Sequence, residues 1–204
     1  MKLLAATRSA GKQREIRRIL QRDDLEVVFP DEVGLHETPS EDALELGETF
    51  ESNARRKAEY FARLSWLPTV ADDSGLEVFA LGGAPGVRSR RWAGVSGTAA
   101  EVTAANNAEL LRRLAGAPEA RRGARYRCVL ILLRTPGALP ERFEGMCTGQ
   151  ILEQPRGSGG FGYDPLFLSG ELGKSFGEAT NEEKDAVSHR GRALRALAAA
   201  LGGE

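Results

Sequence analysis

Residues 124–134, ARYRCVLILLR, give the strongest strand signal in the chain, with the aliphatic run 129–133 at its centre. Pro136 and Gly137 follow and favour a tight turn. Residues 143–151 then alternate as a strand does, which predicts a hairpin and antiparallel pairing. Upstream, predicted strands and helices interleave. The combination predicts an α/β fold with a mixed β-sheet flanked by helices, because a wholly parallel sheet has no hairpins.

The remaining elements are predicted from apolar periodicity and capping residues. Expected strands are residues 3–6, 26–29, 69–71, 76–80 and 166–168. Expected helices include one after residues 7–11 with Ile16, Ile19 and Leu20 on one face, then 49–64, 98–116 and the segment from 188 onward. Capping boxes begin at Thr98 and Thr180, whereas the acidic residues 31–48 are expected as an exposed irregular loop. No repeat or linker divides the chain, so we expect one domain over residues 1–204, with two lobes and a central cleft.

The overall charge gives no bulk attraction to nucleic acid or to membranes. The 204 residues include 28 Lys and Arg against 29 Asp and Glu, for a net charge of −1. Any phosphate site must therefore be local. Only five of the basic residues are lysines, which draws attention to Lys12, Lys57 and Lys184, because a compact ammonium suits a phosphate.

The cysteines and the first residues of the chain indicate a reducing, cytoplasmic compartment. Cys128 and Cys147 lie in strand-like segments without C-x-x-C spacing, and are expected as buried thiols in a reducing environment. The apolar run 3–6 is too short for a signal peptide, and no stretch has transmembrane length. A cytoplasmic protein without a membrane partner is expected.

Two adjacent carboxylates occur in residues 71–76, ADDSGL, at the end of an apolar run. Asp, Ser and Gly all favour turns, and a plain turn is the commoner explanation of such a cluster. The alternative is a magnesium site, because Mg²⁺ selects oxygen ligands and usually binds one or two carboxylates together with substrate phosphates.

Two familiar nucleotide motifs are present only in part. Residues 157–162, GSGGFG, match G-x-G-x-x-G, but a strand-like run follows where a dinucleotide site needs a helix. Residues 173–175, GKS, resemble the end of a P-loop, but Leu168 occupies the position of its first glycine. Both interpretations are rejected, and no His/Cys cluster has zinc spacing.

Four other segments suit a nucleotide. Residues 7–12, TRSAGK, join a strand to a helix whose N-terminal amides favour anions, although a plain connecting turn is as good an explanation. Glu45, a candidate metal carboxylate, precedes a helix on which Asn53 and Lys57 share a face; taken alone, a solvated acidic loop and ordinary surface charge explain these better. Residues 159–165, GGFGYDP, offer aromatic faces for a planar base. Residues 188–191, SHRG, open a helix with two basic groups, and a capped helix start with basic surface residues explains them as well.

Taken in this order, the segments resemble the Ham1-like inosine triphosphate pyrophosphatases over nearly the whole chain. The diagnostic stretches are residues 71–78 (ADDSGLEV), 81–87 (LGGAPGV), 159–165 (GGFGYDP) and 188–191 (SHRG). The resemblance implies hydrolysis of ITP, dITP or XTP to the nucleoside monophosphate and pyrophosphate, with Mg²⁺ as cofactor. It also implies an ITPase-like fold and a homodimer.

Site roles follow from the same resemblance. Asp73 would be the proton acceptor and, with Glu45, a metal ligand. The triphosphate would contact Thr7, Arg8, Ser9, Ala10, Gly11, Lys12, Lys57 and Ser74. The base would lie among Phe161, Gly162, Tyr163, Asp164, Lys184, His189 and Arg190. One position departs from the family pattern: Ser9 stands where asparagine is usual, and serine reaches less far toward a phosphate.

The expected mechanism is attack of water on the α-phosphorus with Asp73 as base, at a rate that rises in mildly alkaline solution. Arg190, which can only donate hydrogen bonds, would favour a purine 6-oxo group over an amino group. Two alternatives stay open. The first is a pyrophosphatase for pyrimidine or other modified triphosphates. The second is a nucleotide-binding or nucleic-acid-binding module with a basic surface of Arg88, Arg90, Arg91, Arg121 and Arg122, which the net charge and the acid pair disfavour.

Overall fold

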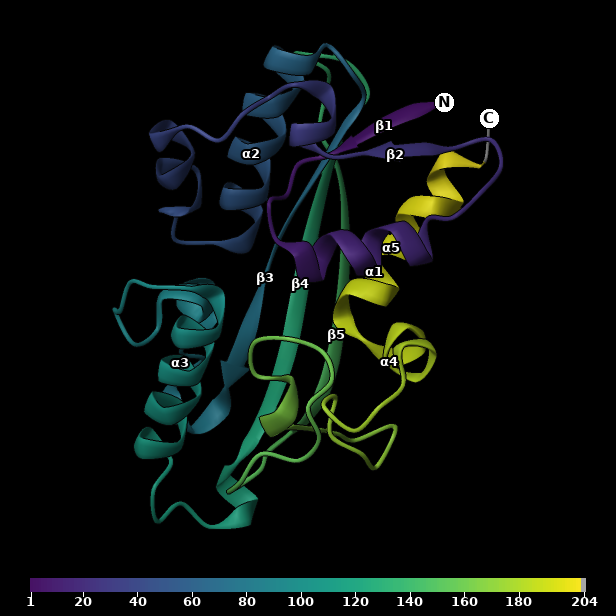
Figure 1. The fold of residues 1–204 in the computed structure, drawn as a ribbon. Helices are drawn as coiled ribbons and strands as arrows, with labels where there is room; N and C mark the ends of the chain where they lie inside the picture. The colour runs from purple at the N-terminus through teal and green to yellow at the C-terminus, as the bar shows by residue number, and fades with distance from the viewer. Residues whose placement is uncertain (203–204) are drawn as a thin grey trace. The chain divides into compact units, whose positions relative to one another are not determined.

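The computed structural model describes residues 1–202 as an α/β protein (Figure 1). Its strands are β1 (Lys2–Ala5), β2 (Glu26–Val28), β3 (Thr69–Val78), β4 (Gly123–Leu133), β5 (Glu141–Ile151) and β6 (Phe167–Ser169). Its helices are α1 (Ala10–Ile19), α2 (Phe50–Ser65), α3 (Ala99–Arg113), α4 (Asn181–Val187) and α5 (His189–Leu201). In this part of the chain, no helix is long and apolar enough to cross a membrane.

The six strands form one mixed sheet in the order β2-β1-β3-β4-β5-β6. β1 pairs in parallel with β2 and with β3, and β5 pairs antiparallel with β6. The mixed α/β sheet predicted from the sequence is therefore confirmed. Parallel pairing arises where a helix returns the chain to the sheet, as α1 does between β1 and β2.

The chain divides into two compact units built from alternating segments. Unit 1 contains residues 1–73, 128–145 and 190–204, of which the structure describes those up to 202, and unit 2 contains residues 74–127 and 146–189. The strands β3, β4 and β5 contribute residues to both units. The sequence analysis predicted one domain with two lobes. The division into two units is compatible with that, and the single domain stays a prediction.

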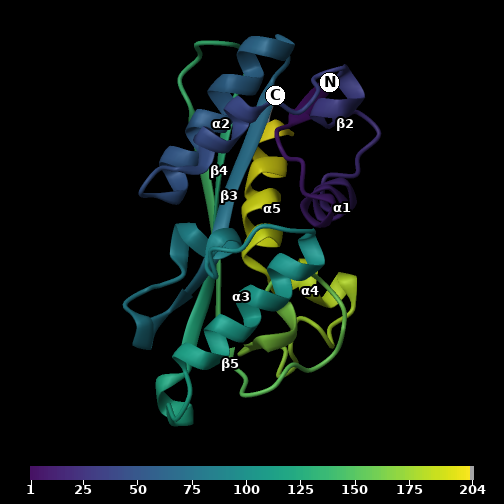
Figure 2. The ribbon, with the colours of Figure 1, turned by 60° about the vertical axis from the view of Figure 1, so that its left-hand side comes forward.

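Unit 1 has helices on both faces of its strands. One core cluster joins α1 and α5 to alternate strand residues, among them Leu3, Val70 and Leu130. Intervening strand residues such as Leu4 and Ile131 are also buried. Figure 2 shows α2 on one side of β3 and β4, and α5 and α1 on the other. Burial on both faces explains why these strands read as continuous apolar runs.

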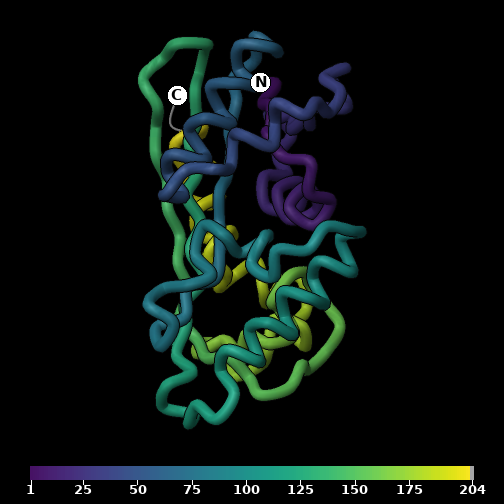
Figure 3. The backbone as a smooth tube through the Cα atoms, turned by 90° about the vertical axis from the view of Figure 1, so that its left-hand side faces the viewer, coloured from purple at the N-terminus to yellow at the C-terminus, as the bar shows by residue number. Residues whose placement is uncertain are grey.

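The end of α5 lies beside the turn that joins β4 to β5 (Figure 3). Arg134 at the end of β4 donates to the Ala200 carbonyl at 3.4 Å and to Glu141 Oε1 at 2.6 Å. A C-terminal carbonyl of a helix has no partner inside the helix, so a cation there is favourable.

Unit 2 has a separate core, rich in aromatic residues. It combines Leu110 and Leu114 of α3 with Leu76 of β3, Tyr126 of β4 and Phe167 of β6. The Tyr126 ring is 4.7 Å from the Phe167 ring, a separation typical of attractive aromatic pairs.

Several local predictions are confirmed. Thr49, Thr98 and Thr180 cap α2, α3 and α4, and each hydroxyl accepts a hydrogen bond from an amide in the first turn. Both cysteines are buried and free. Ser188, expected to cap the last helix, lies between α4 and α5 as the C-terminal cap residue of α4.

Two local predictions are wrong. Residues 69–71 and 76–80 were expected as separate strands around a turn, but β3 is continuous through the acid pair and ends at Val78. Pairing with neighbouring strands satisfies the backbone there and overrides the turn preference of Asp, Ser and Gly. Residues 31–48 are exposed or partly exposed as expected, but they are not irregular throughout, because they include most of η1 (Pro30–Val33) and all of η2 (Pro39–Glu45), two 3₁₀ helices each begun by a proline.

Candidate active site

Asp73 lies in β3 and is 6 % exposed. Its Oδ2 accepts a hydrogen bond from Asn53 Nδ2 on α2 at 2.8 Å, and among residues 1–202 nothing donates to its Oδ1. Burial raises the pKa of Asp73 above the ordinary value, and the nearby Lys57 and Lys12 only partly oppose this effect. One oxygen of a moderately basic carboxylate is thus left for an external proton or cation.

Asp72, the preceding residue, has a different environment. Its Oδ2 pairs with Lys12 Nζ at 2.9 Å and with Arg190 Nη2 at 3.4 Å. Arg190 Nη1 also pairs with Glu15 Oε2 of α1 at 2.5 Å, and Arg190 and Glu15 are both buried. Burial alone would raise the pKa of Asp72, but these cations hold it well below the ordinary value. Asp72 therefore stays ionised and fixes two cations.

Lys57 of α2 connects the acid pair to η2. Its Nζ donates to Glu45 Oε1 at 2.7 Å and to the Asp72 carbonyl. Burial lowers the pKa of Lys57, but the charges of Glu45, Asp72 and Asp73 outweigh burial and raise it. In turn, Lys57 lowers the pKa of Glu45 to about 2. Both groups are charged at neutral pH.

A close backbone approach joins η2 to α2. The Gly47 amide donates to Asn53 Oδ1 at 2.7 Å, so that Asn53 is held between Gly47 and Asp73. A Cβ atom at position 47 would lie 2.3 Å from Ser52 Oγ and 2.5 Å from Asn53 Oδ1. Only glycine fits there unless the turn or the Ser52 and Asn53 side chains move.

The predicted phosphate segment, residues 7–12, follows β1 and includes the first turn of α1. The Thr7 carbonyl accepts from Gln13 Nε2 at 3.1 Å, and Thr7 Oγ1 accepts from the Ser9 amide at 3.2 Å. The Ser9 hydroxyl makes no capping bond to α1. The first amides of α1, at Ala10, Gly11 and Lys12, have no acceptor inside the helix and can bind an anion.

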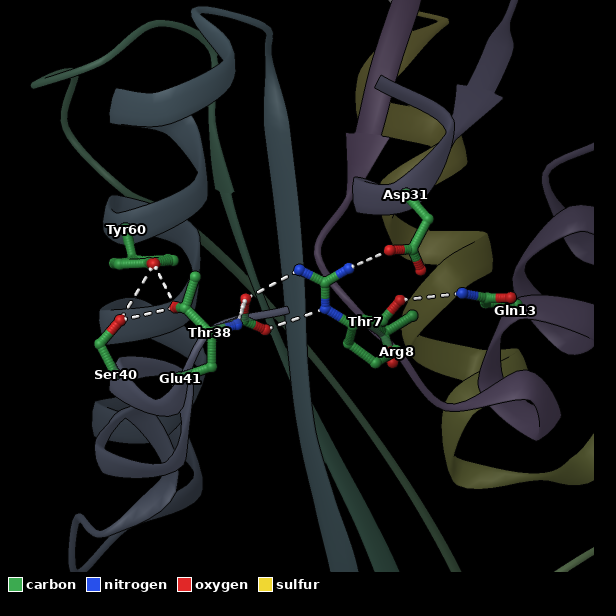
Figure 4. A network of polar contacts seen from close by, with 8 residues as sticks. All are labelled: Thr7, Arg8, Gln13, Asp31, Thr38, Ser40, Glu41 and Tyr60. Atoms are coloured by element: carbon green, nitrogen blue, oxygen red, sulfur yellow. Dashed lines mark hydrogen bonds and ion pairs between the residues drawn. The ribbon is translucent and has the colours of Figure 1, made fainter. Parts of the chain in front are cut away.

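Arg8 of the same segment is bound to two acidic side chains. Figure 4 shows its guanidinium between Glu41 of η2 and Asp31 of η1. Nε and Nη2 donate to the two Glu41 oxygens at 3.0 and 2.8 Å, and Nη1 donates to Asp31 Oδ1 at 2.5 Å. The predicted contact of Arg8 with phosphate stays a prediction.

Within unit 2, Asp164 organises the glycine-rich loop. Its Oδ2 accepts from Lys184 Nζ at 2.5 Å and from the Phe161 amide at 2.7 Å. Its Oδ1 lies 3.4 Å from the Tyr126 hydroxyl. Gly160 has a φ of +72°, and a Cβ there would lie 2.1 Å from Asp164 Oδ2, so the loop depends on glycine at this position.

Aromatic rings surround this ion pair. Lys184 Nζ lies 4.8 Å from the centre of the Phe161 ring, and Phe161 is only half-buried. The His189 ring stacks on Tyr126 at 4.5 Å. Tyr163 is buried, and its hydroxyl donates to the Ser89 carbonyl at 2.7 Å. Tyr163 therefore supports the loop from the protein interior. A partly exposed ring beside a fixed cation suits a planar heterocycle with a carbonyl.

Comparison with known proteins identifies this arrangement. The profile described as Ham1 family matches residues 3–200. The chain belongs to the Ham1 family. A Ham1 protein of known structure from Coxiella burnetii superimposes with a TM-score of 0.86 at 33% identity, covering 100% of both chains. The ITPase-like fold class predicted from the sequence is thereby confirmed.

Two curated relatives are similar over almost their whole length. A protein of Anaeromyxobacter named dITP/XTP pyrophosphatase is 44% identical over 227 aligned positions, covering 98% of this chain and 96% of the relative. A protein of the same name from Yersinia pseudotuberculosis is 45% identical, covering 98% of each chain.

The structure brings together part of the set that the Ham1 resemblance implied. In unit 1, Glu45, Lys57 and Lys12 are linked through Asp72, and the next residue, Asp73, is bound by Asn53 of the same helix as Lys57. In unit 2, Phe161, Asp164 and Lys184 form one group, with Gly162 in the same loop accepting from Asn107 Nδ2 at 3.2 Å. Ser74 is partly buried and follows Asp73 in β3. Arg190 is bound to acids of unit 1.

Sequence reasoning left Glu15, Glu41 and Gly47 without a role and considered Asn53 only as a helix-face neighbour of Lys57. For Gly47 a signal existed, since a glycine just before a capped helix permits a close approach. Glu15 and Glu41 gave no signal, because an acid on a helix or in an acidic loop is ordinarily solvated.

Proposed function

We propose that this chain hydrolyses the non-canonical purine nucleoside triphosphates ITP, dITP and XTP to the monophosphate and pyrophosphate, and so cleanses the nucleotide pool. Family membership and the names of its relatives support this activity. The observation that carries it is Asp73, a buried carboxylate that Asn53 orients by one oxygen while the other oxygen accepts no bond from residues 1–202.

The residues present fit a magnesium ion. Residues 1–202 contain no group of three or more His, Cys, Asp or Glu side chains that could hold a metal by themselves. Glu45 and Asp73 supply two oxygen donors, which is the number Mg²⁺ commonly takes from a protein when substrate phosphates complete its shell. When bound, the ion would neutralise phosphate charge. We propose that Glu45 and Asp73 hold it.

In the proposed reaction, a water molecule attacks the α-phosphorus, the bond to the bridging oxygen breaks, and pyrophosphate leaves. Asp73 Oδ1 accepts the proton of that water. Burial raises the pKa of Asp73, which makes it a stronger base than an ordinary carboxylate. Lys12, Lys57 and the N-terminal amides of α1 stabilise the negative charge on the phosphates.

For the base we propose the group around Phe161, Lys184 and His189 in unit 2. Arg190 is retained as the proposed donor to the 6-oxo group, because a guanidinium rejects an amino group that would face it. Its bonds to Glu15 and Asp72 mean that truncation would disturb the fold, so Arg190→Lys is the informative variant. A cytoplasmic homodimer is also proposed, from the Ham1 resemblance.

The test is pyrophosphate release across a nucleotide panel, with and without Mg²⁺. We expect turnover of ITP, dITP and XTP to exceed that of ATP, GTP, CTP and UTP. Asp73→Asn should reduce turnover by about 10³-fold, within the usual contribution of a general base. The matched control is Asp23→Asn, at an exposed position. Equal turnover of ATP, faster turnover of a pyrimidine triphosphate, or an active Asp73→Asn enzyme would each contradict the proposal.

A further inference from the structure

Arg8 joins four segments of unit 1 that are far apart in the sequence. It belongs to the β1–α1 loop, it pairs with Asp31 of η1 and Glu41 of η2, and its Cζ lies 5.7 Å from the centre of the Phe61 ring on α2. The Arg8 and Glu41 side chains are 17% and 12% exposed, so solvent screens this pair only in part. The two-point contact with Glu41 also fixes its orientation (Figure 4).

The segment that Arg8 contacts has no fully buried residue. Within η2, which ends at Glu45, the apolar side chain of Leu44 is only partly buried. Polar contacts therefore contribute to holding η2 against the unit. Besides Arg8, the Tyr60 hydroxyl lies 3.1 Å from Thr38 Oγ1 and 3.2 Å from Ser40 Oγ. These contacts secure the first half of η2, and Lys57 secures Glu45 at its end.

We propose that Arg8 is a positioning residue, which clamps η2 through Glu41 and so places Glu45 for its role toward a divalent cation. Arg8 would thus act through another residue and not as a ligand of the triphosphate. This inference rests on the proposed function of Glu45. It gives a role to the contacts of Arg8 and of η2 that Figure 4 shows, which binding of phosphate by residues 7–12 would not require.

A direct phosphate contact by Arg8 predicts the opposite response to one substitution. If Arg8 binds phosphate, Glu41 competes with the substrate for the guanidinium, and Glu41→Gln should lower KM for ITP. If Arg8 positions η2, Glu41→Gln loosens the segment, and the Mg²⁺ concentration for half-maximal turnover should rise while kcat changes little.

The first measurement is amide hydrogen exchange of the metal-free full chain, followed in peptides that contain residues 39–46. Arg8→Lys keeps the charge but loses the two-point geometry, and Glu41→Gln keeps the shape but loses the charge. In both variants we expect exchange about tenfold faster than in the wild type, the size expected when one charge-assisted bond is lost. This readout needs neither metal nor turnover.

Arg17→Lys is the matched control. Arg17 lies on α1, pairs with Glu32 of η1 and has its Cζ 4.8 Å from the centre of the Phe29 ring, so its chemistry matches that of Arg8 without a contact to η2. It should leave the exchange of residues 39–46 and the Mg²⁺ dependence unchanged.

The outcomes separate the two proposals. Faster exchange in both variants together with an increase of about fivefold to tenfold in the half-saturating Mg²⁺ concentration, the effect of one charged hydrogen bond, supports positioning. Unchanged exchange overturns it, as does a lower KM for ITP in Glu41→Gln. If none of the proteins hydrolyses ITP but exchange accelerates, the clamp stands and the proposed function fails.

Discussion

At the scale of single residues, Asp72 and Asp73 are neighbours in one strand with opposite environments. Successive side chains of a strand point to opposite faces, which separates the two carboxyl groups. Asp72 meets Lys12 and Arg190, and its pKa is lowered; Asp73 meets Asn53, and burial raises its pKa. The sequence analysis gave the proton and the metal to Asp73, and these environments agree with that proposed division.

The two pKa shifts predict stability changes of opposite sign. The folded-state pKa of Asp73 is raised, so between the unfolded and the folded pKa the folded protein binds more protons than the unfolded protein. The free energy of unfolding therefore falls as the pH rises through the folded pKa. Asp73→Asn does not titrate and avoids this loss of stability. At pH 7 the metal-free variant should be more stable by about 0.5–2 kcal/mol, a gain typical of substitutions that relieve a functional site.

Asp72→Asn should act in the other direction. Its folded-state pKa is lowered, so its stabilisation is present above the unfolded pKa and is lost as pH falls. Breaking a buried pair costs about 3–5 kcal/mol, and Glu15 still partners Arg190, so we expect about 3 kcal/mol at pH 7. Urea unfolding of Asp73→Asn and Asp72→Asn between about pH 3 and 8, where carboxyl groups titrate, measures both changes in the free energy of unfolding. If both variants gain stability at pH 7, or both lose it, this account is wrong.

At the scale of elements, the function proposed for unit 1 depends on how closely η2 approaches α2. Thr49 caps α2 and directs Asn53 and Lys57 from the same helix face, four residues apart, toward the acid pair. Gly47 lets the backbone before the cap reach Asn53. The helix therefore presents both polar groups only if the preceding turn has no side chain at position 47.

Gly47→Ala tests this close approach. The added methyl would overlap Ser52 and Asn53, and relief requires a shift of the turn or of the Asn53 rotamer. We expect a cost of about 1–3 kcal/mol, as for overpacking, and a fall in kcat as Asn53 releases Asp73. The matched control is Gly170→Ala, where the nearest atom to a new Cβ is the Thr148 carbonyl at an acceptable 3.4 Å. Equal kcat values for Gly47→Ala and wild type would count against the role of this turn.

At the scale of the whole molecule, one buried ion group joins distant parts of the sequence. Arg190 of α5 is separated by 175 positions from Glu15 of α1 and by 118 from Asp72 of β3. All three side chains are nearly inaccessible, at 2%, 6% and 1% exposure. Such a group contributes little net stability when complete but is costly to break.

Arg190→Ala should therefore unfold more easily, by about 3–5 kcal/mol, because it removes the buried cation that Glu15 and Asp72 share. The double variant Glu15→Gln/Arg190→Lys keeps a cation for Asp72 and removes the extra acid, and should recover most of that loss. Thermal and urea unfolding measure both. If Arg190→Ala is as stable as the wild type, Arg190 does not hold unit 1 together and its proposed role at the base gains weight.

The sequence by itself determined the elements whose signals are local. Capping residues, glycines and apolar periodicity act over a few positions, and they correctly predicted α2, α3, α4 and the strands β4 and β5. The ordered motifs also determined the family, and the Ham1 profile confirms it. These features depend on residues that are close in the sequence, and they can therefore be predicted without knowing the fold.

Only the tertiary structure decided the continuity of β3 through the acid pair, the partners of Glu15 and Glu41, and the orientation of Arg8 toward η2. Each depends on groups that are distant in the sequence, and no local pattern selects one acid among 29 as the partner of a given arginine. Burial then sets the charge behaviour of Asp72 and Asp73, because a carboxylate's pKa follows its surroundings and not its neighbours in the sequence.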